Sequence, residues 1–212
     1  MNMTKHSLIF YISCKITLIM KPLKLTLFLI MSTIMIFSFE QSHATSDPIL
    51  ITHSTDIHNV IFDGKWTNEV EWKHSSHNLF SYDQMVIHLR TAHHENFIYV
   101  FVDPISDTIL DHNADKTTIC FDAKNNKNTT PDNNDFCFSV SLNQQNGILQ
   151  QGNSNGSFDI LDTVEFIAIS TVSDENDRYT KIPHPSYEFK IPIELLERSD
   201  NYGFYLSFYD AI

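Results

Sequence analysis

The chain has 212 residues, with 26 Asp and Glu against 14 Lys and Arg, so its formal net charge is −12 at neutral pH. A surface this acidic repels phosphate backbones, which argues against a nucleic-acid partner. Four of the basic residues but only one acidic residue, Glu40, precede residue 45, so the remaining 168 residues carry a net charge of −15. That length suffices for one domain with its own core, and we expect a single domain over 45–212.

The N-terminal segment has the pattern of a secretory signal peptide. Lys21 and Lys24 give it a basic start, and residues 25–39 carry no charge. Small residues then precede a cleavage point after Ala44. Basic, apolar and small-residue regions in this order are typical of a cleaved leader.

We therefore predict that 1–44 is a signal peptide, with an upstream extension before Met20, and that the protein is secreted or displayed at the cell surface. The alternative is an uncleaved leader, which would then be the membrane contact of the protein. The uncharged run is shorter than the ~20 residues of a spanning helix, which favours cleavage.

Nine later segments have the composition of β-strands. Residues 84–93 alternate between two faces, and 97–102 form a continuous β-branched and aromatic run. The other predicted strands are 117–121, 136–142, 147–151, 157–161, 164–170, 187–191 and 203–209. Short strands separated by turn residues predict an all-β fold, an antiparallel sandwich of jelly-roll type. One short helix is expected over 193–198, with Pro192 at its first turn.

One hairpin can be placed by its register. Asp122 and Asp135 flank a twelve-residue loop rich in Asn and Asp, residues that tolerate left-handed turns. If these aspartates pair, Cys120 and Cys137 face each other directly, within disulfide reach of an antiparallel pair. Export would bring both cysteines into an oxidising compartment, so we predict a disulfide. The alternative is two small buried hydrophobic side chains.

The densest polar cluster in the sequence consists of seven aspartates, four of which lie where a predicted strand begins or ends: Asp103, Asp107, Asp111, Asp115, Asp122, Asp132 and Asp135. Calcium takes six to eight oxygen ligands, which carboxylates and loop carbonyls supply. We therefore expect a structural calcium site, and the candidate ligands are Asp103, Asp115, Asp122 and Asp135. The spacing is not that of an EF-hand, and the alternative is that these carboxylates are solvated loop residues.

Catalytic and transition-metal signatures are absent from the sequence. It contains no G-x-S-x-G, phosphate loop, dinucleotide fingerprint or HExxH, so we expect a non-catalytic protein. Nine histidines follow residue 44, and scattered surface positions explain them as well as a metal site does. Met85, the one methionine after residue 44, is expected to pack in the core rather than to ligate haem.

Exposed aromatic rings could provide a sugar-binding surface. Pyranose rings stack on aromatic planes while nearby polar groups bind the hydroxyls. Trp66 and Tyr179 lie in polar surroundings and are the candidate carbohydrate-binding residues, whereas Trp72 is expected in the core.

Four motifs in order resemble the family-9-like carbohydrate-binding modules. They are the opening Asp63-Gly64-Lys65-Trp66 with Glu71-Trp72, the strand Asn96–Asp103, Asp115 with Ile119–Asp122, and the late strand Tyr187–Pro192. The resemblance spans roughly 62–210 and implies a β-sandwich of the superfamily that includes DOMON haem and sugar domains. It also implies calcium in the acidic loops, with a metal or loop-ordering role for Asp103, Asp115 and Asp122. No tryptophan follows Trp72, so the two-tryptophan clamp of sugar-binding members would need a tyrosine.

The resulting prediction is a secreted, non-catalytic carbohydrate-binding module for an extracellular or cell-surface polysaccharide or glycan. Two alternatives remain. One is an exported haem-binding domain of DOMON type, and the other is a calcium-stabilised envelope protein without a sugar ligand.

Overall fold

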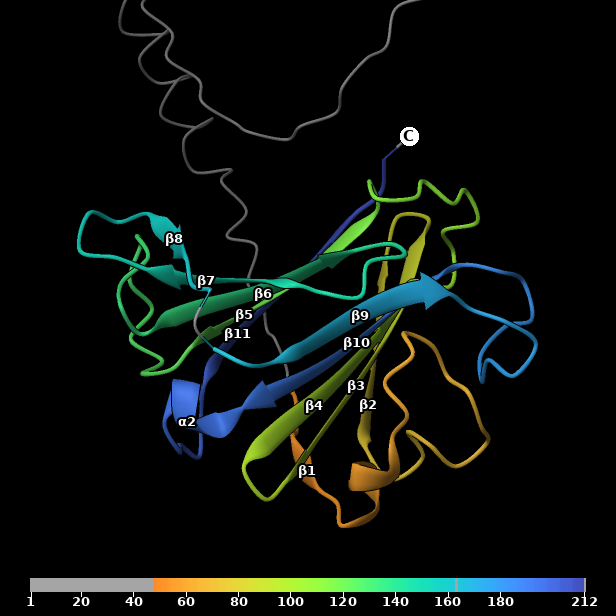
Figure 1. Ribbon diagram of the computed structural model, residues 1–212, viewed down its shortest axis with the longest axis horizontal. Coiled ribbons are helices and arrows are strands. Elements are labelled where there is room, and N and C mark those ends of the chain that lie inside the picture. Colours follow the sequence, from red (N-terminus) through yellow and green to blue (C-terminus); the bar gives the residue numbers. More distant parts are fainter. Residues whose placement is uncertain (1–47, 163, 212) are drawn as a thin grey trace, which may run out of the picture. The chain divides into compact units, whose positions relative to one another are not determined.

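A computed structural model describes residues 48–162 and 164–211, which form two β-sheets packed face to face (Figure 1). The all-β sandwich expected from the sequence is therefore confirmed. The predicted signal peptide falls outside the described residues. None of the helices within the described ranges is long and apolar enough to cross a membrane.

Sheet A has the strand order β1-β3-β4-β10-β9, with β2 also paired to β3. Its strands are β1 (Thr52–His53), β2 (Ser76–Tyr82), β3 (Met85–His94), β4 (Phe97–Asp103), β9 (Ile167–Val172) and β10 (Pro185–Pro192). The β1–β3 pair is parallel and the others are antiparallel. Neither β1, which has two residues, nor β2 was predicted from the sequence. Because most β2 side chains are exposed, that strand has no buried face to impose alternation.

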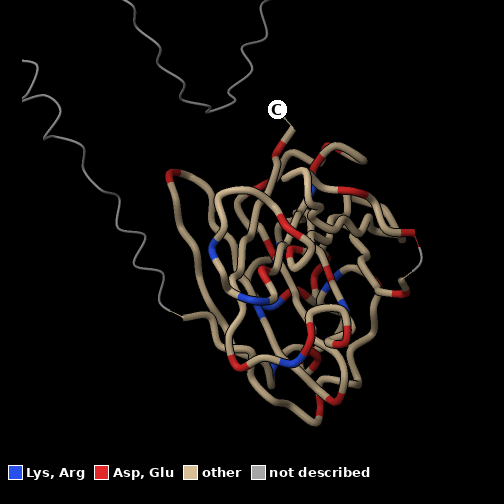
Figure 2. Tube along the Cα trace, turned by 90° about the vertical axis from the view of Figure 1, so that its left-hand side faces the viewer, with Lys and Arg blue, Asp and Glu red and all other residues tan. Residues whose placement is uncertain are grey.

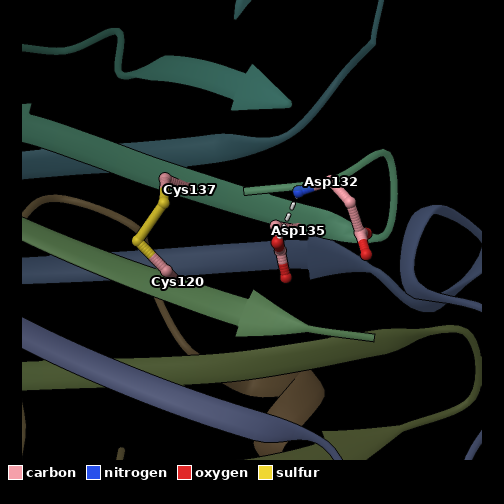
Figure 3. The surroundings of a disulfide bond; sticks show 4 residues. All are labelled: Cys120, Asp132, Asp135 and Cys137. Atoms are coloured by element: carbon pink, nitrogen blue, oxygen red, sulfur yellow. Dashed lines mark hydrogen bonds between the residues drawn. A yellow bond between two sulfur atoms is a disulfide. The ribbon is translucent and has the colours of Figure 1, made fainter. Parts of the chain in front are cut away.

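Sheet B has the strand order β11-β5-β6-β7-β8, and all its pairs are antiparallel. Its strands are β5 (Lys116–Asp122), β6 (Asp135–Ser141), β7 (Ile148–Gly152), β8 (Phe158–Ile160) and β11 (Gly203–Tyr209). The predicted hairpin is confirmed, because Asp122 pairs with Asp135 and Cys120 with Cys137. The two cysteines form the predicted disulfide, which links β5 to β6 (Figure 3).

Two short helices accompany the sheets. The expected helix is present as α2 (Ile193–Leu196) and is two residues shorter than predicted, because Glu197 adopts a left-handed conformation. Pro192 precedes the helix rather than occupying its first turn. A 3-10 helix, η1 (Asp56–Asn59), was not predicted from the sequence.

The main core lies between the sheets and consists of inward-facing side chains from both, including Leu89, Val100, Val102, Ile119, Phe121, Phe138, Phe189 and Ile191. Burying one such side chain contributes roughly 1.5–3 kcal/mol to stability. The continuous apolar sequence of β4 follows from burial on both of its faces. Ile98, Val100 and Val102 enter this core, whereas Tyr99 and Phe101 enter a second apolar cluster on the other face of sheet A.

That second cluster contains Ile57, Val60, Trp66, Trp72, Ala92, Tyr99 and Phe101. Four of these come from the segment 54–75, which therefore packs over the outer face of sheet A. Tyr179, from the loop 173–184, packs against the same cluster. We call this surface the covered face, and the outer surface of sheet B the open face.

Candidate functional site

The Asp63-Gly64 turn attaches the segment 54–75 to the covered face. One carboxylate oxygen of Glu188, on β10, accepts the backbone N–H groups of Asp63 (3.0 Å) and Gly64 (2.8 Å). The other oxygen accepts Trp72 Nε1–H at 3.0 Å. Gly64 has φ +89°, and a Cβ there would lie 2.7 Å from backbone atoms of β9. The opening motif thus has a structural role, because these hydrogen bonds hold the segment 54–75 against the sheet.

Glu71 reinforces the same turn. Its carboxylate accepts the backbone N–H groups of Ile61 and Thr67, both at 2.7 Å. Burial raises the pKa of Glu71, and it raises that of Glu188 well above the ordinary range despite three donated hydrogen bonds. Both carboxylates therefore organise the covering segment rather than face a substrate.

The exposure expected of Trp66 is wrong. Its side chain is 1% exposed and meets Phe101 and Tyr179 edge to face, with ring centroids 5.8 and 6.0 Å apart. The guanidinium of Arg90 lies 5.3 Å from its ring centroid. The polar residues beside Trp66 in the sequence belong to the segment 54–75 that covers the sheet. The indole itself is buried in the apolar cluster beneath that segment. Trp72 is buried as expected.

Tyr179 is half-buried. One face of its ring stacks on His88, with centroids 3.5 Å apart, and its hydroxyl accepts Arg90 Nε–H at 2.6 Å. Trp66 and Tyr179 are thus brought together, as a pair of sugar-binding rings would require. They contact each other and the sheet, so neither provides an open platform.

A buried acid–histidine cluster lies beside Tyr179 and consists of Asp103, Asp177 and His184. Asp103 ends β4, and the other two residues belong to the loop 173–184. His184 Nε2 lies 2.7 Å from Asp103 Oδ1 and 4.0 Å from Asp177 Oδ2. Asp177 was not among the site residues predicted from the sequence, because only the fold of the loop brings it to Asp103.

Burial dominates the electrostatics of this region. It raises the pKa of Asp103 to about 7, although the hydrogen bond from His184 opposes the shift. Burial lowers the pKa of His184, but the hydrogen bond and charge of Asp103 outweigh it, so the net shift is upward. The pKa of His88 falls to about 4 because of burial and the neighbouring His77, whose Nε2 lies 2.8 Å from His88 Nδ1.

A second cluster, the oxygen cluster, contains Asp107, Asp115 and Asp210. Asp107 and Asp115 lie in the β4–β5 loop, and Asp210 follows β11. Asp115 accepts backbone N–H groups from Asp111 (2.8 Å) and Ala211 (3.1 Å). Asp107 Oδ2 and Asp210 Oδ1 are buried atoms without a hydrogen-bond partner among the described residues.

The electrostatics of the oxygen cluster reflect its concentrated negative charge. Burial, with the neighbouring charges of Asp210 and Asp115, raises the pKa of Asp107 to about 6. Burial and the three carboxylates also raise the pKa of Tyr187, whose hydroxyl has no hydrogen-bond partner among the described atoms. A cation would relieve this repulsion, and three carboxylates with a nearby hydroxyl offer oxygen donors only.

The four aspartates expected to share one metal site do not come together. Asp103 belongs to the acid–histidine cluster and Asp115 to the oxygen cluster. Asp122 and Asp135 flank the β5–β6 loop and order it: Asp122 accepts two backbone N–H groups, and Asp135 accepts that of Asp132 (Figure 3).

The open face carries the exposed aromatic rings of sheet B. Tyr205 and Tyr209, on the edge strand β11, are 58% and 59% exposed. Their register places them opposite Cys120 and Lys116, with Ser207 opposite Thr118 between them. Carboxylates are widespread over the domain, whereas Lys and Arg are few (Figure 2).

No family model, curated protein or solved structure matches this chain. The resemblance to carbohydrate-binding modules therefore stays a prediction from the motifs, and the geometry of the site must support any function.

Proposed function

We propose that residues 45–212 form a secreted, non-catalytic carbohydrate-binding module that calcium stabilises. The observation that carries the proposal is the pair of exposed tyrosines on the open face, with hydroxyl-bearing residues between them. Sugar C–H faces stack on aromatic rings, and hydroxyl groups bind the sugar hydroxyls.

The open face favours an oligosaccharide. Tyr205 and Tyr209 are four residues apart on one strand, which separates their Cα atoms by about 13 Å. A single pyranose ring cannot contact both, so an extended glycan lying along β11 fits better. Ser207 and Thr118, between the two rings, would bind its hydroxyl groups.

Affinity electrophoresis through gels containing different polysaccharides, with calcium present, tests the glycan proposal. Tyr205→Ala and Tyr209→Ala should each reduce the retardation seen with the wild-type protein. Tyr82→Ala is the matched control, because Tyr82 is 85% exposed but lies on β2 of sheet A. Absence of retardation on every polysaccharide would contradict the proposed sugar binding. It would favour the alternative of a calcium-stabilised envelope protein without a sugar ligand. A Soret absorbance band would instead favour the haem alternative.

Calcium is assigned to the oxygen cluster. Asp107, Asp115 and Asp210 would hold the ion, because calcium prefers oxygen ligands and two of these carboxylates have buried oxygens without a partner. The ion would join the loop after β4 to the end of β11. It would neutralise charge that otherwise opposes folding.

Thermal unfolding with chelator and with calcium tests this assignment. Calcium should raise the unfolding temperature, since a ligand at 100 times its Kd stabilises by about 2.7 kcal/mol. Asp210→Asn should abolish the shift, whereas Asp122→Asn, at the ordered hairpin, should retain it. Equal melting with and without calcium would contradict the calcium part of the proposal alone.

A further inference from the structure

The acid–histidine cluster takes no part in the proposed function, and it has the arrangement of a second kind of site. One carboxylate oxygen of each aspartate and a ring nitrogen of His184 all lie within 4.8 Å of one another. Asp103, Asp177 and His184 are 0%, 2% and 0% exposed. The cluster joins the end of β4 to the loop that covers it.

Two carboxylate oxygens in this cluster have no hydrogen-bond partner among the described residues. Asp103 Oδ1 contacts His184, and Asp177 Oδ1 accepts the backbone N–H groups of Tyr179 (2.7 Å) and Thr180 (2.9 Å). Asp103 Oδ2 and Asp177 Oδ2 are buried without a partner. Asp177 Oδ2 lies 4.0 Å from His184 Nε2, so it points into the cluster. Buried carboxylate oxygens are costly unless a donor or a cation satisfies them.

The imidazole of His184 is oriented as in a metal ligand. Its Nδ1 lies 2.7 Å from the backbone carbonyl oxygen of Ile182, which can only accept a hydrogen bond. Nδ1 therefore donates to this carbonyl, and Nε2, which faces the two carboxylates, donates to Asp103 Oδ1. A metal ion would replace the proton on Nε2, and Nδ1 would keep its proton. Histidines that bind metals commonly have their other nitrogen fixed in this way.

Basic side chains do not balance these charges. Within the described part of the chain, His184 is the one cationic group that forms an ion pair with Asp103 or Asp177. Arg90, the nearby guanidinium, donates to the Tyr179 hydroxyl and more weakly to the carbonyls of Trp72 and Ser75. Two buried carboxylates thus share one imidazole, an arrangement that a divalent cation would complete.

We propose that Asp103, Asp177 and His184 bind a divalent transition-metal ion, with Zn²⁺ as the preferred ion. An imidazole nitrogen with two carboxylate oxygens matches the donors of zinc, whereas calcium prefers oxygen alone. Three protein ligands leave a coordination position for water or another small ligand. The bound ion would fix the loop 173–184 to β4, and this holds whether or not the module binds glycans.

Zinc titration of the full chain by calorimetry, in excess calcium, tests the proposal. We expect one Zn²⁺ per chain. His184→Gln or Asp177→Asn should weaken zinc binding more than about 100-fold, because loss of a ligand should exceed the loss caused by changing a residue that only supports a ligand. Two controls should retain zinc. Asp210→Asn alters the oxygen cluster, and His53→Gln alters a group of neighbouring histidines on β1 and β3.

A spectroscopic readout on the wild-type chain covers the case in which the variants fail to fold. Nitrogen NMR of the histidine rings should show Zn²⁺ shifting His184 Nε2 while Nδ1 keeps its proton. Co²⁺ should give the visible bands of a low-symmetry site. Unperturbed His184 resonances at saturating zinc, or zinc affinity lost in His53→Gln and kept in His184→Gln, would overturn the proposal and leave a buried Asp–His pair.

Discussion

The two outer faces of the sandwich differ in how they are completed. The covered face lies beneath the segment 54–75 and the loop 173–184, which bring two tryptophans, buried carboxylates and the acid–histidine cluster onto sheet A. The open face has a disulfide and short hydroxyl side chains at its centre, with exposed tyrosines on its edge strand. One face is thus a second core, and the other remains accessible.

This difference gives the opening motif, Asp63 to Trp72, a structural role in place of a ligand-binding one. Asp63-Gly64, Trp66 and Glu71-Trp72 resemble a segment of carbohydrate-binding modules, but their contacts hold a loop against the sheet. A ligand surface on the covered face would require that loop to leave. A ligand surface on the open face requires no rearrangement.

The largest expected effect is on stability, from Trp66→Ala. Removing a side chain that is 1% exposed should destabilise the protein by about 3–5 kcal/mol, because it leaves a cavity between Phe101 and Tyr179. Tyr205→Ala, on the open face, should change stability by no more than about 0.5 kcal/mol. Urea unfolding compares the two variants. Similar midpoints would show that Trp66 is not part of a core.

The next effect concerns the open face. Replacing Cys120 and Cys137 together by serine should cost about 3 kcal/mol, since the bridge closes a segment with a sequence separation of 17. The two strands should still pair, because their inward side chains Ile119 and Phe138 remain in the core. Urea unfolding with and without reductant measures the loss. Two free thiols in protein purified under oxidising conditions would contradict the predicted bridge.

A smaller loss is expected where the covering segment turns. Gly64→Ala places a side chain at φ +89° and against the backbone of β9, which should cost about 1–3 kcal/mol. Gly156→Ala is the matched control, because it also has positive φ but meets only the side chain of Thr130. Comparing the unfolding temperatures of the two variants separates the cost of positive φ alone from the added cost of contact with the β9 backbone. Equal losses would mean that the turn does not press on β9.

The sequence predicted the strands best where burial imposes a pattern. β4 was recognisable because both its faces are buried, and β3 because the apolar Ile87 and Leu89, which pack in the main core, alternate with the polar His88 and Arg90. β2 escaped because its side chains are largely exposed. The Cys120–Cys137 pair was predictable because the two strands are joined by one loop, which fixes their register.

The candidate sites could not be predicted in the same way. Asp103 and His184 are 81 residues apart, and Asp115 and Ala211 are 96 apart, so only strand pairing brings them together. The acidic loops indicated where carboxylates are abundant, but not which would be buried together. The burial of Trp66 was missed for the same reason. Its polar sequence neighbours indicated exposure, but the fold packs its side chain against the sheet.

The last prediction compares protonation at the covered face with that at the β5–β6 loop of sheet B. Burial raises the pKa of Glu188 well above 4.5, whereas hydrogen bonds from Asn134 and Asn126 lower the pKa of Asp132 below 3.8. Carboxyl carbon NMR titration should therefore give a midpoint for Glu188 above 4.5 and one for Asp132 below 3.8. Coincident midpoints would contradict the difference between the two regions.

The two shifts act on stability in opposite directions. The folded state holds the Glu188 proton more tightly than the unfolded chain does, so its contribution is complete below about pH 4.5 and is lost as the pH rises through its folded pKa. The Asp132 contribution is present above about pH 3.8 and is lost as the pH falls through its lowered pKa. A rise in pH above 4.5 should thus loosen the covering segment, and a fall in pH below 3.8 the β5–β6 loop. Hydrogen exchange at Gly64 and Asn134, followed against pH, distinguishes the two.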